Sequence, residues 1–153
     1  MAVPAPDECS VRARMDALAD AIEFVEAFCA DRGVAESDAL RLSLVLEELF
    51  TNTVVHGHGG DSEALVSLAL RADASDLELT YEDSAPPFDP LDHVAKSPID
   101  PPVSLVDRPI GQLGIPLIVN MAERIAYARA DGCNRIRLAL RRQGGVSTPA
   151  DPA

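Results

Sequence analysis

The sequence LSLVLEELFTNTVVHGHGG, residues 42–60, is an apolar helical pattern that carries a regular stripe of polar side chains. Glu48, Asn52 and His56 follow one another at four-residue intervals. At about 100° per residue they lie along one edge of a helix, while Glu47 falls on its solvated side. The apolar residues of the segment fall beside the stripe, where they would face a core: Leu42, Leu46, Leu49 and Phe50.

This polar stripe has two interpretations. It can be the polar shoulder of an ordinary amphipathic helix. Alternatively, a carboxylate and a carboxamide one turn apart, beside a cleft, provide the oxygen ligands that a hard cation such as Mg²⁺ prefers. Motifs elsewhere in the chain are needed to decide between the two.

The composition is that of an ordinary globular domain. The chain has 153 residues, of which 47% are hydrophobic and 25% charged, which suits one domain with its own core. No apolar run reaches the roughly 18–20 residues of a membrane span, and the first residues lack the basic and apolar regions of a secretory signal. We therefore expect a cytoplasmic protein with no membrane partner.

The charge and the cysteines exclude two further classes of site. The formal net charge of −12 argues against a nucleic-acid partner, because phosphate neutralisation requires clustered Lys and Arg. A single nucleotide is still compatible, since backbone N–H groups and a metal ion can hold it. Cys9, Cys29 and Cys133 lie far apart, and their spacing predicts neither a zinc site nor a disulfide framework.

The remaining patterns predict the element order β, α, α, β, β, lid, α, β, β. CSVRARM alternates like a short edge strand, a helix follows from Asp16 to Arg32 with Gly33 at its C′ position, and Ser37 is the expected N-cap of the next helix, which runs to about His56. Two pairs of alternating runs predict hairpins: ALVSLALRA with DLELTYED, and RIAYARA with RIRLALRR. The order predicts an α+β two-layer sandwich, a mixed, mostly antiparallel sheet with three helices on one face.

The same patterns predict the domain boundaries. Residues 1–8 and 143–153 read as flexible tails on either side of a folded region, residues 9–142. Residues 84–109 contain seven prolines and little apolar periodicity. A loop this long inside a compact domain is usually a functional lid or a disordered segment.

Two further motifs carry candidate binding residues. Asp83 closes the second strand of the first hairpin, and a carboxylate there can accept a hydrogen bond from an exocyclic amine such as that of adenine. Gly111 and Gly114, in IGQLGIPLIV, precede a helix whose first turn holds Pro116, and such glycines let backbone N–H groups approach phosphates. Taken alone, Asp83 can also be an ordinary strand-end acid, and the glycines a plain turn.

The order and spacing of these motifs resemble those of a known family. EELFTN with His56 resembles the N box, E-x-x-x-N-x-x-x-H, of the ATP-binding fold shared by DNA gyrase, histidine kinases and MutL, the Bergerat-type or GHKL fold. EDSAPPFDP resembles its G1 box and GQLGI its G2 box. Within the fold, the chain looks most similar to the small anti-sigma-factor serine/threonine kinases, over roughly residues 9–142.

The resemblance implies a role for each matching position. Asn52 would coordinate Mg²⁺ that bridges the phosphates of ATP, and Asp83 would hold the adenine amine. Gly111 and Gly114 would shape the phosphate side of the site. Glu48 would be the catalytic base that takes the proton from an attacking serine hydroxyl.

Three more residues of these boxes are expected ATP-binding residues. His56 belongs to the N box and Ile115 to the G2 box, and for His56 a structural role at the helix end is an equal alternative. Ala85 belongs to the G1 box, but it stands where the family has glycine. A methyl group at this position can crowd the purine or restrict the backbone.

Two functions follow from the resemblance. The first is an ATP- and Mg²⁺-binding anti-sigma factor, possible as a homodimer, that sequesters a sigma factor and acts as a protein serine kinase on a STAS-type anti-anti-sigma partner. The second is a degenerate module of the same fold that regulates transcription by protein–protein binding without kinase activity. Glu48 favours the first, because a pure binder needs no base, whereas Ala85 and the proline-rich lid favour the second.

Overall fold

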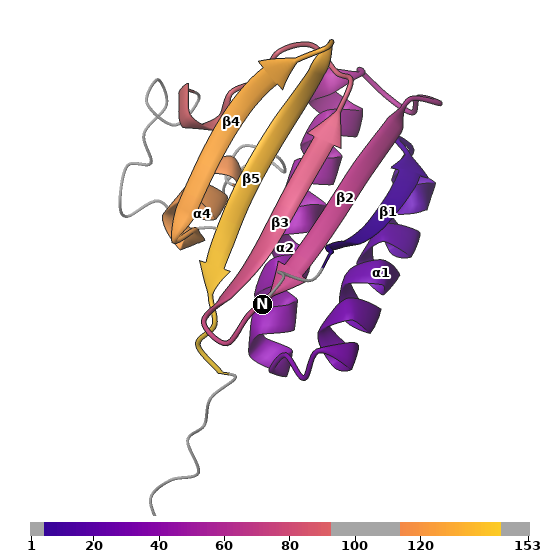
Figure 1. Cartoon of the computed structure of the whole chain (residues 1–153). Helices are drawn as coiled ribbons and strands as arrows, with labels where there is room; N and C mark the ends of the chain where they lie inside the picture. The colour runs from indigo at the N-terminus through magenta and orange to yellow at the C-terminus, as the bar shows by residue number, and fades with distance from the viewer. Residues whose placement is uncertain (1–4, 93–113, 145–153) are drawn as a thin grey trace, which may run out of the picture.

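A five-stranded antiparallel sheet forms one layer of the molecule, and helices cover one of its faces (Figure 1). The structure is a computed structural model that describes residues 5–92 and 114–144. The strands lie in the order β1-β2-β3-β5-β4, and each neighbouring pair is antiparallel. Their bounds are Asp7–Arg12 (β1), Leu65–Ala72 (β2), Asp76–Asp83 (β3), Arg124–Ala130 (β4) and Cys133–Arg141 (β5). The predicted α+β two-layer fold is confirmed, with a sheet that is antiparallel throughout these pairings rather than mixed.

The helices occur in the predicted order and pack on the same face of the sheet (Figure 1). None of the helices described is long and apolar enough to cross a membrane. Their bounds are Met15–Ala17 (η1, a 3₁₀ turn), Leu18–Asp31 (α1), Glu36–Thr51 (α2), Asn52–Gly57 (η2) and Gly114–Met121 (α4).

Local signals in the sequence place most of the helix ends. Gly33 follows α1 with a φ of +65°, and the N–H of Val34 donates to the Cys29 carbonyl at 2.9 Å, so the predicted glycine terminus is confirmed. Pro116 lies in the first turn of α4, where its missing N–H costs nothing. The prediction of Ser37 as an N-cap was wrong, because the extended residue before α2 is Ala35 and it makes no side-chain cap.

Strand β3 shows how the two faces of the sheet divide. Leu77, Leu79 and Tyr81 are buried against the helices, and Asp83 continues this row at the end of the strand. The alternate residues, such as Thr80, lie on the other face. The alternation therefore places an acid on the helix side of the sheet, in one row with buried hydrophobic side chains.

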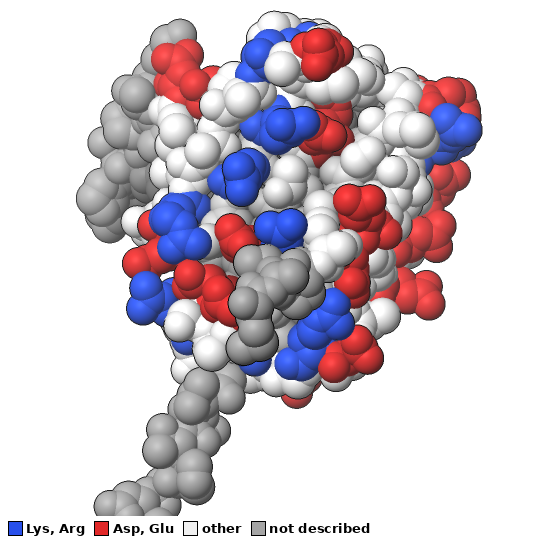
Figure 2. Space-filling model, in the orientation of Figure 1, with Lys and Arg blue, Asp and Glu red and all other residues white. Residues whose placement is uncertain are grey.

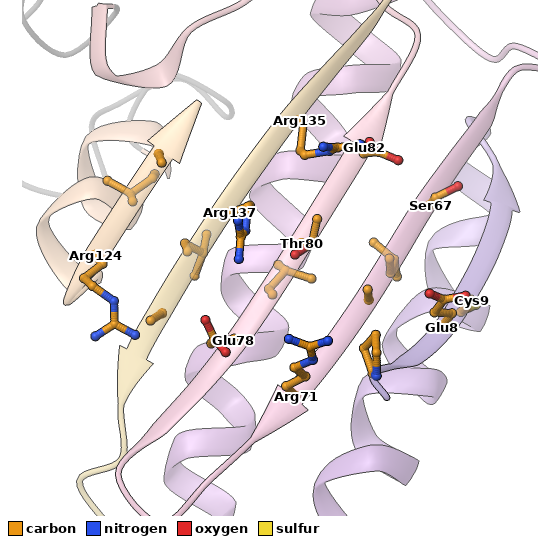
Figure 3. Close-up of a pocket in the computed structure, with 18 of the residues that line it drawn as sticks. Glu8, Cys9, Ser67, Arg71, Glu78, Thr80, Glu82, Arg124, Arg135 and Arg137 are labelled. Carbon is orange, nitrogen blue, oxygen red and sulfur yellow. The ribbon is translucent and has the colours of Figure 1, made fainter. Parts of the chain in front are cut away.

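The second face of the sheet carries mostly small and charged side chains. Figure 2 shows Arg side chains over the middle of this face, and acidic side chains along the side formed by β1 and α1. A shallow hollow of about 660 Å³ lies on it. Arg71, Arg124, Arg135 and Arg137 project there from three strands, with Glu78 and other acids between them (Figure 3). None of the predicted site residues lines this hollow.

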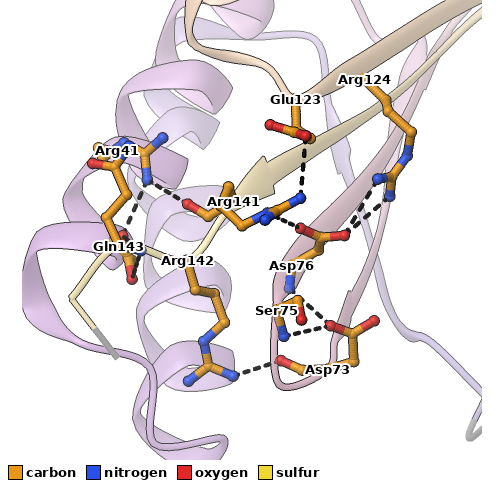
Figure 4. A network of polar contacts seen from close by, with 10 residues as sticks. Arg41, Asp73, Ser75, Asp76, Glu123, Arg124, Arg141, Arg142 and Gln143 are labelled. Atoms are coloured by element: carbon orange, nitrogen blue, oxygen red, sulfur yellow. Dashed lines mark hydrogen bonds and ion pairs between the residues drawn. The ribbon is translucent and has the colours of Figure 1, made fainter. Parts of the chain in front are cut away.

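A buried carboxylate ties the end of β5 to α2, and Figure 4 labels two of the residues that donate to it, Arg41 and Gln143. Asp38 has no solvent exposure and accepts hydrogen bonds from the N–H groups of Gln143 and Gly144 at 3.1 Å and from the Arg41 guanidinium at 3.0 Å. Burial acts to raise the Asp38 pKa, but these donors outweigh it, and the pKa lies below its ordinary value. The same guanidinium also donates to the carbonyl of Arg141 at 3.0 Å.

At both ends of the chain, described structure extends slightly into the segments predicted as tails. β1 begins at Asp7, inside the tail that the sequence predicts for residues 1–8. Gln143, the first residue of the other predicted tail, is held by Asp38. The predicted lid, residues 84–109, is described only as far as residue 92, and the rest of it lies outside the described residues.

Candidate functional site

The polar stripe of the second helix ends in a widened turn. α2 stops at Thr51, and Asn52–Gly57 form a π-helical turn in which the N–H of His58 donates to the Thr53 carbonyl at 2.9 Å. The sequence predicts a regular helix through this point, so the turn is a departure from expectation. The Thr53 hydroxyl lies 3.0 Å from the Leu49 carbonyl, a contact that often bends helices. Such π-turns are rare and often lie at functional sites.

A small cavity of about 110 Å³ lies between this turn and the end of β3. Four of the predicted ATP-binding residues line it: Asn52, His56, Asp83 and Ala85. Leu49, Phe88 and Ile136 supply apolar walls. An apolar cavity with a few converging polar groups is the usual form of a small-molecule site.

Asp83 is the central polar group of this cavity, and its side chain is buried. Its Oδ2 accepts a hydrogen bond from the Thr53 hydroxyl at 2.8 Å. Its Oδ1 accepts from the Ala85 N–H at 3.0 Å and from the Asn134 amide at 2.8 Å. A carboxylate offers about four lone pairs, so these three donors leave one acceptor position, on Oδ2, for a ligand.

A second buried hydroxyl, that of Tyr81, contacts the Thr53 hydroxyl that donates to Asp83. The hydroxyl of Tyr81 lies 2.7 Å from the Thr53 hydroxyl and 3.2 Å from the Leu49 carbonyl. Burial raises the pKa of Tyr81, and the nearby charge of Asp83 adds to this, so the phenol stays protonated and acts as a donor. The Thr53 hydroxyl has a single proton, which it can donate to Asp83. The Tyr81 hydroxyl can then donate to the Leu49 carbonyl in its place.

Sequence reasoning missed three members of this group: Thr53, Tyr81 and Asn134. Tyr81 precedes Asp83 by two residues in β3, and alternation alone places both on the same face. Thr53 follows Asn52 on the buried side of the predicted helix, so the pattern could have identified it as well. Asn134 lies on β5, which neighbours β3 in the sheet but is distant from it in sequence, and no local signal connects Asn134 to Asp83.

The methyl group of Ala85 is accommodated because the neighbouring residue, Gly57, has no side chain. The sequence raises two objections to alanine here, a strained backbone and a crowding methyl. Ala85 is not among the residues with positive φ, so its backbone does not require glycine. A Cβ on Gly57 would lie 2.7 Å from the Ala85 Cβ, which means that the methyl occupies space that Gly57 leaves open.

Glu48 lies against the first residue of α4 and is not among the residues that line the cavity. A Cβ on Gly114 would overlap the Glu48 carboxylate and lie 2.6 Å from its Cγ, so only glycine allows this close approach. Burial raises the pKa of Glu48, and the neighbouring charge of Glu47 raises it further. Within the described part of the chain, no cation pairs with this carboxylate.

Of the other two residues predicted from the G2 box, the structure describes only Ile115. Gly111 falls outside the described residues. Ile115 follows Gly114 in α4 and is buried in the hydrophobic core, and it does not line the cavity. Their expected roles toward ATP remain predictions.

The donor set of the cavity suits a magnesium ion that a ligand brings with it. In the described ranges, no group of three His, Cys, Asp or Glu side chains could hold a metal ion by itself. Asn52 lines the cavity and offers one carboxamide oxygen. Mg²⁺ is commonly held by one or two protein oxygens together with substrate phosphates and water, so a single protein donor fits.

The contact between Gly57 and Ala85 predicts a coupled pair of substitutions. Gly57→Ala should lower the free energy of unfolding by about 1–3 kcal/mol, because the added methyl overpacks the wall of the cavity. Ala85→Gly should restore most of this loss in the double variant, since it removes the opposing methyl. Urea unfolding of the four proteins measures the coupling, and strictly additive effects would show that the two positions are not in contact.

The comparison with known proteins assigns the family. Residues 11–140 match the family model of the histidine kinase-like ATPase domain. No curated protein matches the chain. Domains of this type bind ATP, usually with Mg²⁺. The match runs from β1 into β5 and includes the cavity, Glu48 and the start of α4. The chain therefore belongs to the family of histidine kinase-like ATPase domains.

Proposed function

We propose that the chain binds ATP with Mg²⁺ in the cavity and acts as a protein serine/threonine kinase of the anti-sigma-factor type. The proposed substrate is a serine of a STAS-type anti-anti-sigma protein, and the proposed second partner is a sigma factor that the chain sequesters. The observation that carries the kinase assignment is the carboxylate of Glu48, which has a raised pKa and lies against the start of α4. A protein that only holds partners has no use for such a base.

Different residues contact different parts of the nucleotide. Asp83 accepts the exocyclic amine of adenine on Oδ2, and the apolar walls, among them Leu49 and Ile136, enclose the purine. Asn52 provides the protein ligand to Mg²⁺. The N-terminus of α4, beginning at Gly114, faces the phosphates and offers its backbone N–H groups to them. When bound, Mg²⁺ neutralises the charge that develops on the phosphates.

Glu48 acts on the hydroxyl that attacks the γ-phosphorus. It takes the proton of the serine hydroxyl while the serine oxygen forms its bond to that phosphorus. The bond from the γ-phosphorus to the bridging oxygen of the β-phosphate breaks, and ADP leaves with the electron pair. A carboxylate whose pKa is raised by burial is a stronger base than one in water, which favours this transfer.

A second candidate function rests on the size of the cavity. Its volume of about 110 Å³ lies below the roughly 300–1,000 Å³ of typical ligand pockets. The Ala85 methyl takes up part of the space beside Gly57. On this alternative, the chain is a degenerate module that regulates transcription by protein binding alone. We propose a cytoplasmic homodimer in both cases.

Nucleotide binding is predicted to depend on Asn52. Calorimetric titration of ATP with Mg²⁺ should give a Kd on the order of micromolar for the unaltered protein. Asn52→Ala should lose most of this affinity, because it removes the protein ligand to the metal. Asn120→Ala is the matched control, since Asn120 is exposed on α4 and outside the cavity, and it should bind normally. No heat at millimolar ATP would contradict the kinase and favour the binding module.

Phosphoryl transfer is predicted to depend on Glu48 and not on its neighbour. Glu48→Gln should keep its affinity for ATP with Mg²⁺ but transfer label from γ-labelled ATP to a STAS-domain protein at least about 100-fold more slowly. Glu47→Gln makes the same change on the solvated side of the helix and should transfer at close to the normal rate, because burial, the larger cause of the raised Glu48 pKa, is unchanged. Equal rates in the two variants would exclude Glu48 as the base. Binding of ATP without transfer to any STAS-domain protein of the same genome would argue against the kinase itself.

A further inference from the structure

Asn134, which the sequence patterns did not identify, makes several polar contacts to the candidate site. It is buried on β5 and lies directly opposite Asp83 of β3 in the sheet register. Its amide nitrogen lies 2.8 Å from Asp83 Oδ1, 3.1 Å from the Ala85 carbonyl and 3.0 Å from the Pro86 carbonyl. One side chain therefore contacts both the base-binding carboxylate and the segment that follows it.

The oxygen of the same carboxamide is fully used as well. Asn134 Oδ1 accepts a hydrogen bond from the N–H of Phe88 at 3.1 Å and from the Tyr127 hydroxyl at 2.6 Å. Three acceptors surround its nitrogen, which has two protons to share among them, and two donors surround its oxygen. Only one orientation of the amide places the nitrogen against acceptors and the oxygen against donors. Arg129, from the same hairpin, also donates to the Ala85 carbonyl at 2.6 Å.

These contacts determine which oxygen of Asp83 is free. Asn134 and the Ala85 N–H occupy both lone pairs of Oδ1. On Oδ2, only Thr53 donates, so the open acceptor position lies there. Rotation of the carboxylate would break both bonds to Oδ1, and the carboxylate is therefore held in one orientation.

We propose that Asn134 is a positioning residue for nucleotide recognition: it holds Asp83 so that Oδ2 faces the amine of the base, and it fixes residues 85–88 as the wall of the cavity. This inference rests on the proposed binding of ATP and adds the residue that makes the base contact selective. The role needs a carboxamide, because it combines a two-proton donor with an acceptor. A carboxylate at position 134 would instead place its oxygens against three other acceptors.

The test compares two ligands that differ only in the group that Asp83 recognises. ATP carries the 6-amino group, and purine riboside triphosphate lacks it. The unaltered protein should prefer ATP by about 10- to 100-fold, the range expected for a hydrogen bond to a charged group. In Asn134→Ala, ATP should bind more weakly, and the preference should fall to within about threefold of unity, because Asp83 is no longer held.

Two further variants keep the test decisive. Asn134→Val restores bulk and strand propensity if the alanine variant fails to fold, and it should lose the preference in the same way. Tyr127→Phe removes one contact to Asn134 Oδ1 but leaves the bonds to Asp83, and it should keep the preference. Thermal unfolding confirms that each protein is folded before titration.

The outcomes separate the two claims. A folded Asn134→Ala or Asn134→Val that binds both nucleotides more weakly by the same factor overturns the positioning role and leaves ATP binding intact. Failure of the unaltered protein to bind either nucleotide overturns the proposed function and the positioning role together. A preference that collapses at position 134 and survives in Tyr127→Phe supports the assignment.

Discussion

The carboxylate of Asp83 is the contact on which the candidate site depends. It is buried at the end of β3, where its three donors come from η2, from the segment after β3 and from β5. A buried charge of this kind is costly unless donors surround it. The same donors that satisfy the charge join three separate parts of the chain around one cavity. A single lone pair remains for a ligand, and the proposed recognition of adenine uses it.

The second constraint is the close approach of two helices beside this cavity. Gly114 has no side chain, and the carboxylate of Glu48 fills the space at the start of α4. Burial and the charge of Glu47 make the ionised form of Glu48 less favourable, so the position costs stability at neutral pH. Such a cost is expected where a side chain serves chemistry rather than packing. The start of α4 and the proposed base therefore lie against each other.

Local signals in the sequence predicted most of the fold, and long-range contacts account for what they missed. Gly33 and Pro116 mark helix ends through backbone conformation alone, so their positions could be predicted. Ser37 has the right chemistry for a cap but lies inside the helix, since Ala35 supplies the extended residue. The contacts of Thr53 with Tyr81 and Asp83 join residues distant in sequence, as do the contacts of Asn134 with Asp83 and Phe88. Periodicity and spacing contain no information about such contacts.

A crystal structure of the chain with a non-hydrolysable ATP analogue and Mg²⁺ tests the central claim most directly. We expect the base to lie in the cavity with its amine within hydrogen-bond distance of Asp83 Oδ2, and Asn52 to coordinate the metal. We also expect the γ-phosphate near the start of α4, within reach of a hydroxyl that Glu48 can deprotonate. A nucleotide bound in the hollow on the opposite face of the sheet, or a base turned away from Asp83, would contradict the proposal.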